Sequence, residues 1–136
     1  MAQASGMFAV RLEPQQLSEA EQAAGLGRMS IDKQFSGDLE GTSAGEMVAA
    51  MTAVEGSAGY VALERVTGRL GGRSSSFVLQ HNGLADRGTQ QLTITVVPDS
   101  GTGELVGLRG QMAIQVEGGE HRYTLEYTLP SVTSLT

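Results

Sequence analysis

The chain has 136 residues and carries fifteen acidic against nine basic side chains, a formal net charge of −6. That length is typical of one domain. An acidic chain without a run of basic residues lacks the positive surface that attracts nucleic acids and anionic membranes. The absence of cysteine excludes disulfides, thiolate metal ligands and a cysteine nucleophile. We therefore expect a single domain over residues 1–136, with no nucleic-acid or membrane partner.

The composition favours strands over helices. Nineteen glycines, no tryptophan and only six phenylalanines and tyrosines suit many short strands joined by tight turns. The first ten residues lack the basic start and sustained apolar core of a signal peptide. No apolar run approaches the length that spans a bilayer. These features predict a cytoplasmic protein.

In chain order, the first expected strand is residues 8–12, where apolar residues alternate, and Pro14 ends it. Residues 18–21 match a capping box, which predicts a short helix over 17–24.

A hairpin is expected next. Two segments, 29–35 and 38–42, flank a Ser-Gly dipeptide, and a two-residue turn there would place Lys33 opposite Glu40. Residues 46–54 are rich in Met and Ala, which favour helix, but pairing with neighbouring strands often overrides such propensity. We predict a strand there.

A second hairpin is centred on the Gly-Gly dipeptide at 71–72, with arms over 60–70 and 73–81. Both faces of this hairpin carry apolar residues, which in a barrel suggests the lumen on one side and a partner subunit on the other. We therefore predict a homo-oligomer, with a dimer favoured. The expected pairs are Val66 with Phe77, Glu64 with Leu79, and Ala62 with His81.

Residues 89–97 are a further strand, rich in Thr, Val and Ile, which a tight turn over 98–103 ends. The clearest alternation lies in 111–117 and 121–127, on either side of a second Gly-Gly dipeptide. The total predicts an all-β fold: a closed antiparallel barrel of about eight strands with little helix. The expected pairs in the last hairpin are Val116 with His121, Ile114 with Tyr123, and Met112 with Leu125.

Several spaced motifs together resemble one known family. They are Lys33-x-Phe35-x-Gly37-Asp38-Leu39-x-Gly41, Gly59-Tyr60-x-Ala62-x-Glu64, Gly72-Arg73 followed by Phe77-x-Leu79-x-His81-x-Gly83, Ser100-Gly-Thr-Gly103-x-Leu105-x-Gly107, and His121-x-Tyr123-x-Leu125-x-Tyr127. In this combination the chain resembles an uncharacterised bacterial family grouped with the allene oxide cyclase-like barrels. The resemblance implies a small closed barrel. It does not imply cyclase activity, because no motif places the plant enzyme's catalytic residues on this sequence.

Three short motifs suggest chemistry that their context opposes. Gly41-Thr-Ser43-Ala-Gly45 matches the nucleophile elbow of serine hydrolases, which needs a strand, a sharp turn and a helix. A glycine-rich strand is the better interpretation here. Gly101-Thr-Gly103 with Gly107 is one residue out of step with a dinucleotide fingerprint. A calcium loop that begins at Asp99 would need side-chain oxygens at positions three and five, where Gly101 and Gly103 have none.

The candidate site lies at one mouth of the predicted barrel. If the strands run strictly up and down, Tyr60, Glu64, His81 and His121 converge there on the inward face, and Tyr123 shares that face. Glu64 and His81 are the catalytic candidates, as an acid/base pair. The alternatives are a metal site of two histidines and one carboxylate, and plain hydrogen bonding between buried polar groups. With two histidines and no cysteine, we expect no bound metal, and no cofactor.

The leading functional hypothesis is a barrel that binds a small apolar ligand, with cyclase- or isomerase-like chemistry as an extension. The rival hypothesis is a structural or protein-interaction barrel with a filled lumen and no ligand. Open space beside Glu64 and His81 would favour the first, whereas a lumen packed by aromatic and aliphatic side chains would favour the second. From the sequence, Glu64→Ala should destabilise the fold clearly and Glu64→Gln much less.

Overall fold

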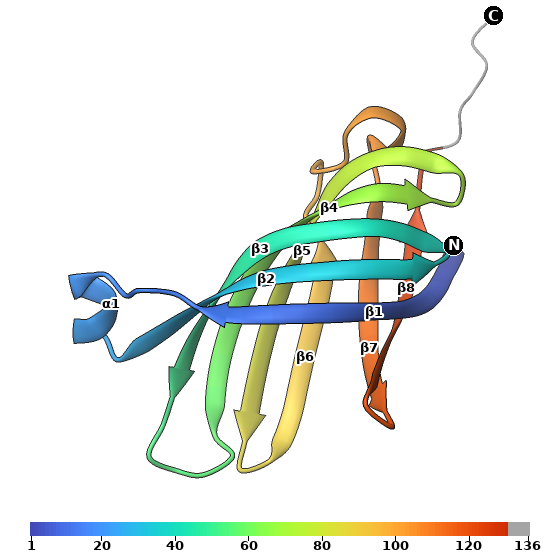
Figure 1. Cartoon of the computed structure of the whole chain (residues 1–136). Coiled ribbons are helices and arrows are strands. Elements are labelled where there is room, and N and C mark those ends of the chain that lie inside the picture. Colours follow the sequence, from blue (N-terminus) through green and yellow to red (C-terminus); the bar gives the residue numbers. More distant parts are fainter. Residues whose placement is uncertain (131–136) are drawn as a thin grey trace, which may run out of the picture.

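In the computed structural model, residues 1–130 are described, and they form a closed barrel of eight antiparallel strands that pair in sequential order (Figure 1). The predicted all-β barrel is therefore confirmed. A short helix, α1 (Glu19–Ala23), and a 3₁₀ turn, η1 (Gly103–Leu105), are its helical elements. The strands are β1 (Ala2–Pro14), β2 (Leu26–Gly37), β3 (Leu39–Met51), β4 (Ala58–Leu70), β5 (Arg73–Asp86), β6 (Thr89–Val96), β7 (Arg109–Glu117) and β8 (Glu120–Thr128).

Both Gly-Gly hairpins have the predicted register. Every pair expected in the β4–β5 and β7–β8 hairpins is present. All four glycines have positive φ, between 57° and 83°, as a two-residue hairpin turn of this hand requires. The β7–β8 and β4–β5 turns lie at opposite ends of the barrel, as strict up-and-down topology demands.

The expected pairing of Lys33 with Glu40 is wrong. Lys33 pairs with Ser43, so the β2–β3 turn is centred on Asp38. Two contacts with β1 hold Asp38 there: its carboxylate accepts from the Ser5 N–H at 2.9 Å, and its own N–H donates to the Ser5 carbonyl at 3.1 Å. The shift turns the Lys33 side chain into the lumen and leaves Glu40 exposed.

The other local expectations can also be compared with the structure. The strand predicted over 46–54 is present as far as Met51, where β3 ends. Helix α1 lies within the predicted range, and its capping box is formed between Ser18 and Glu21. No helix in the described part of the chain has both the length and the hydrophobicity to cross a membrane.

One end of the barrel, which we call the sealed end, is closed by the connection between β6 and β7. This connection lies beside β5 and hydrogen-bonds to it through side chains at every second residue. It is a longer structure than the tight turn expected from its glycines, and Leu105 and Leu108 on it are buried over the end of the lumen. Its side-chain acceptors are Ser100 for Val78 N–H, Thr102 for Ser76 N–H and Glu104 for Ser74 N–H, at 3.0, 3.1 and 3.0 Å.

At the opposite end, the splayed end, the strands separate. β1 pairs with β8 only as far as Phe8, and β6 pairs with β7 at two positions only. Figure 1 shows the β7–β8 hairpin standing apart from the lower part of β6. The gap between β6 and β7 holds a cavity of about 410 Å³. The cavity opens to the outer face. Its inward-facing lining residues are Leu92, Ile94, Met112 and Ile114, and its outward-facing ones are Thr93, Gln111, Ala113, Thr124 and Glu126.

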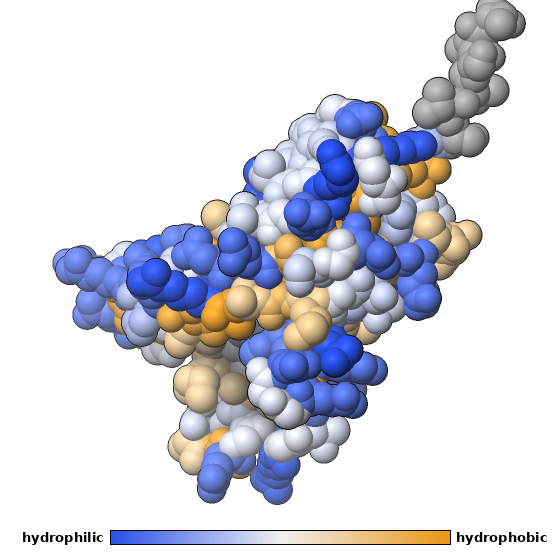
Figure 2. Space-filling view, turned by 45° about the vertical axis from the view of Figure 1, so that its right-hand side comes forward, coloured by the Kyte–Doolittle hydropathy of each residue, from blue (hydrophilic) through white to orange (hydrophobic). Residues whose placement is uncertain are grey.

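Exposed hydrophobic side chains gather in the splayed half. Among the exposed large hydrophobic residues within 1–130, only Met1 and Val106 belong to the sealed end. In Figure 2, hydrophobic surface lies beneath the arm that carries α1, beside a hollow. The splayed half therefore exposes more hydrophobic surface than the sealed end. Its exposed large hydrophobic residues are Leu12, Met51, Val54, Val61, Leu63, Leu84, Leu92 and Val116.

Candidate functional site

The centre of the candidate site is the carboxylate of Glu64, which is fully buried in the lumen. It accepts three hydrogen bonds: from Lys33 Nζ at 2.8 Å, from Ser43 Oγ at 2.7 Å, and from His81 Nε2 at 2.5 Å. All four side chains are buried. Buried polar groups are stable when their hydrogen bonds are satisfied, and here they satisfy one another.

The four residues come from four consecutive strands, β2 to β5, and each occupies an inward-facing position of its strand. Gly45 on β3 allows β4, the strand that carries Glu64, to pack closely against it. It pairs with Glu64, and a side chain on Gly45 would bring its Cβ within 2.6 Å of the Glu64 Cα. The glycine-rich segment of β3 is thus required by close strand packing.

Two opposing effects act on the pKa of Glu64. Burial raises it, but the His81 hydrogen bond and the positive charge of Lys33 together outweigh burial and lower the pKa to about 2. The carboxylate is therefore ionised at neutral pH and acts only as an acceptor. The proton in the short contact with His81 belongs to Nε2.

Lys33 was not among the candidates found in the sequence. Its ammonium group lies 4.8 Å from the Phe8 ring centroid and 5.9 Å from that of Phe35, in addition to its contact with Glu64. A signal for it existed, since Lys33 is the only lysine of the chain. It was lost because the incorrect turn register paired Lys33 with Glu40.

The structure brings Glu64 and His81 into direct contact and places Tyr60 beside them. Tyr60 is half-buried on the splayed side, and its ring lies across Gly83, where an added Cβ would be 2.2 Å from the ring. Burial and the negative charge of Glu64 raise the pKa of the Tyr60 hydroxyl.

The other two sequence candidates lie farther away. His121 is half-buried and packs against Phe8, with ring centroids 5.2 Å apart and ring planes tilted by 42°, and it makes none of the hydrogen bonds to Glu64. Tyr123 is buried toward the sealed end. Its hydroxyl accepts from the Leu39 N–H at 2.9 Å and lies within hydrogen-bond distance of the Ser36 carbonyl, so it fastens the β2–β3 turn to β8.

Two alternatives from the sequence, a metal site and the nucleophile elbow of a serine hydrolase, can be compared with the described residues. Among residues 1–130, no three His, Cys, Asp or Glu side chains lie close enough to hold a metal ion. The cation beside Glu64 is the Lys33 ammonium group. Ser43 lies within a strand and its hydroxyl donates to Glu64, so the glycine-rich-strand interpretation is confirmed and there is no strained elbow.

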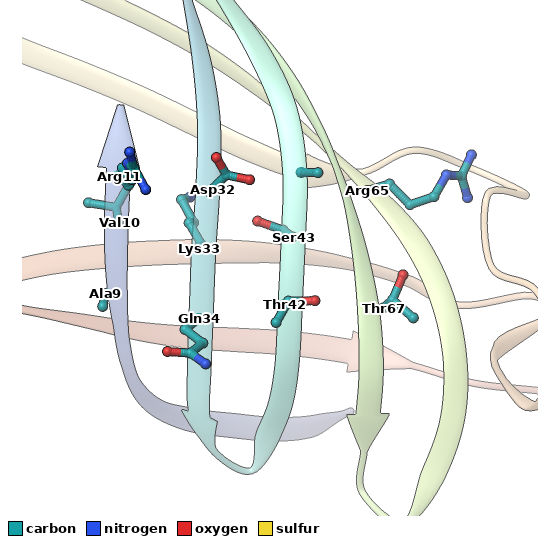
Figure 3. Close-up of a pocket in the computed structure, with 11 residues that line it drawn as sticks. Ala9, Val10, Arg11, Asp32, Lys33, Gln34, Thr42, Ser43, Arg65 and Thr67 are labelled. Carbon is teal, nitrogen blue, oxygen red and sulfur yellow. The ribbon is translucent and has the colours of Figure 1, made fainter. Parts of the chain in front are cut away.

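A second depression, of about 540 Å³, lies over β1 to β4, and Lys33 and Ser43 of the buried cluster are among its lining residues. Arg11, Asp32 and Arg65 are its charged, exposed lining residues. Figure 3 shows Arg65 directed away from Arg11 and Asp32. Because these charges do not converge, the depression offers no focused binding site, and the buried cluster remains the best candidate.

Comparisons with known proteins agree with this fold. The sequence model of a family described as "Protein of unknown function (DUF3224)" matches residues 4–127. The chain belongs to the DUF3224 family. A crystal structure of a DUF3224 protein of unknown function from Shewanella oneidensis MR-1 is 50% identical to this chain, with a TM-score of 0.90, covering 97% of this chain and 99% of that one.

No curated protein matches this DUF3224 chain. The match of the family model over residues 4–127 confirms the expected membership of an uncharacterised family. The grouping with allene oxide cyclase-like barrels rests on the sequence resemblance alone.

Proposed function

We propose that this DUF3224 barrel binds a small apolar molecule at its splayed end, above the cluster of Glu64 and His81. One observation carries the proposal: the packing of inward-facing side chains changes at the level of this cluster. Most of the large inward-facing side chains toward the sealed end are buried, whereas toward the splayed end Leu12, Leu92 and Val116 are exposed, beside buried Ile31 and Ala62. Ligand sites are commonly apolar walls with a few polar groups at fixed positions.

The sealed half has no room for a ligand. Phe77, Leu79, Tyr123 and Leu125 fill the lumen there, and all four are buried in one hydrophobic cluster. A ligand is therefore restricted to the splayed half.

The splayed half presents inward-facing apolar side chains that the protein itself does not cover. Leu12 and Leu92 face inward yet are 46% and 43% exposed, and Met47 and Ile114 are half-buried. A bound apolar molecule would remove this surface from water, which is favourable. The cavity between β6 and β7, about 410 Å³, has the size of small-ligand sites.

Cyclase- or isomerase-like chemistry, where present, would fall to His81 and Glu64. A carboxylate that holds an imidazole in one orientation is a common arrangement for moving a proton. This pair is buried in the lumen, and Tyr60 stands beside it on the splayed side.

A neutral dye tests the binding function. N-phenyl-1-naphthylamine, which fluoresces strongly in apolar surroundings, should bind wild-type protein saturably. Val116→Arg places a charge on the inner wall of the splayed end and should weaken binding roughly tenfold or more, because burying an unpaired charge is costly. Fluorescence titration gives the dissociation constants.

Val106→Arg is the matched control, since Val106 and Val116 are 62% and 61% exposed but lie at opposite ends of the barrel. Its affinity for the dye should equal that of wild type. Equal weakening by both variants, or no saturable binding by wild type, would contradict the proposed site.

A second candidate function is protein interaction, favoured by the apolar outer face of β4 and β5. Three apolar side chains there point away from the lumen and are more than half exposed: Val61, Leu63 and Leu84. Exposed apolar patches on a sheet face often mark subunit contacts. We propose a homodimer through this face.

Light scattering tests the dimer. Wild-type protein should have twice the 14.2 kDa mass of one chain at micromolar concentration. Leu63→Arg should shift the mass to that of one chain without loss of folding, because an exposed position tolerates arginine. A wild-type mass of one chain would rule out this interface at that concentration.

A further inference from the structure

The facing edges of β6 and β7 have no strand partner toward the splayed end. β6 pairs with β7 only at Ile94 and Thr95, so its residues 89–93 run beside an open gap within the described part of the chain. Residues 113–117 of β7 border the same gap. Because the cavity in this gap opens to the outer face, a segment of another chain can reach these edges from outside.

The backbone groups that β6 leaves free can be assigned. The Val97 N–H donates to the Val78 carbonyl at 2.9 Å, and the unbroken β5–β6 register begins at the next pair. Successive residues of an antiparallel strand direct their N–H and C=O groups to alternate sides. Gln91 therefore bonds to β5, whereas Gln90 and Leu92 direct theirs into the gap. The turn and loop hydrogen bonds within residues 1–130 do not use these groups.

Of the free edges at the splayed end, that of β6 is the least protected. β1 extends beyond its last pair with β8, but this extension carries Arg11, Glu13 and Pro14. The free edge of β7 ends in Glu117. Charged residues and proline on an edge discourage pairing with other chains. Residues 89–93 contain neither, and their threonines favour strand structure.

The shape of the gap restricts what can enter it. A strand that belongs to a sheet brings its neighbouring strand with it, and that neighbour would meet the β7–β8 hairpin on the other side of the gap (Figure 1). A single extended segment, with both of its own edges free, avoids this clash. Addition of such a segment to a free sheet edge is a recurring mode of peptide binding.

The walls of the gap specify the side chains of that segment. Residues directly opposite each other on antiparallel strands share a face, so those opposite Gln90 and Leu92 point inward. Apolar side chains there would cover Leu92, which is 43% exposed, and half-buried Ile114 on the other wall. The charged residue that lines the cavity is Glu126, on the outer face, which favours uncharged or basic side chains at the outward positions.

We propose that β6 binds an extended segment of another protein in this gap. The segment pairs antiparallel with residues 89–93, with apolar side chains inward and uncharged or basic side chains outward. This inference does not rest on the proposed small-molecule site.

A synthetic peptide tests the proposal on wild-type protein. A rhodamine-labelled peptide of alternating valine and threonine, with lysine at both ends, should bind saturably in fluorescence polarisation. N-methylation of its valines removes the N–H groups that face β6 and should weaken binding about tenfold or more, because several hydrogen bonds are lost. N-methylation of its threonines is the matched control and should leave the affinity unchanged, because those N–H groups face away from β6.

Gln90→Pro tests the same contact from the protein side. It removes one N–H that faces the gap and leaves the β5–β6 hydrogen bonds in place, as proline on an edge does. The variant should melt like wild type and bind the unmodified peptide several-fold more weakly.

Hydrogen exchange of wild-type amides, measured by NMR, gives a readout that needs no variant. Without peptide, the Gln90 and Leu92 amides should exchange fast, whereas that of Gln91 is protected by its bond to β5. Saturating peptide should slow exchange at Gln90 and Leu92.

Four results would overturn the proposal. They are no saturable binding of the unmodified peptide, equal weakening by the two methylated peptides, and peptide binding that leaves exchange at Gln90 and Leu92 unchanged. The fourth is protection of these two amides in the free protein that is lost on dilution, because a second copy of the chain would then cover the edge.

Discussion

Replacing Glu64 by either alanine or glutamine is expected to lower the free energy of unfolding by about 3–5 kcal/mol. The reason is Lys33. Its ammonium group is buried and pairs with Glu64 at 2.8 Å, so removal of the carboxylate leaves a buried charge without its partner. The sequence suggested a mild effect for glutamine, because the amide preserves shape and hydrogen bonding. The contact with Lys33 changes that expectation.

The Lys33→Met/Glu64→Gln double variant tests this explanation. It removes both charges, and replacement of a whole buried ion pair is often nearly neutral. We expect urea unfolding to return the double variant to within about 1–2 kcal/mol of wild type, clearly above either Glu64 single variant. A double variant as unstable as Glu64→Gln would show that the loss comes from packing or from His81, not from the charge of Lys33.

Acid should remove the same stabilisation. The pKa of Glu64 is about 2 in the folded protein, against an ordinary value of 4.5. Because the folded pKa is the lower one, the contribution is fully present above pH 4.5 and is lost as the pH falls toward 2. The difference corresponds to about 3 kcal/mol.

Other carboxylates titrate over this range, so a comparison isolates Glu64. Urea unfolding of wild type and of the Lys33→Met/Glu64→Gln variant should be measured at pH 5 and at pH 2. The free energy of unfolding of wild type should fall by about 3 kcal/mol more than that of the variant. Parallel losses in the two proteins would mean that Glu64 titrates near its ordinary value.

Local patterns in the sequence were sufficient for most of the fold. The two Gly-Gly turns determine their own registers, because the positive φ angles they need specify a two-residue loop. From these registers, Glu64 and His81 follow as inward-facing neighbours. Such features depend on residues a few positions apart, which is why alternation and turn chemistry reveal them.

The rest of the site was decided by contacts between residues far apart in the chain. Ser5 and Tyr123 hold the β2–β3 turn around Asp38 from 33 and 84 residues away, and that turn directs Lys33 to Glu64. The early separation of β6 from β7 likewise follows from how the whole barrel closes. The sequence by itself determined the strands, their alternation and the Glu64–His81 pair. Only the tertiary structure decided the partner of Glu64, the sealed end and the splayed end, because these depend on long-range pairing that no local pattern encodes.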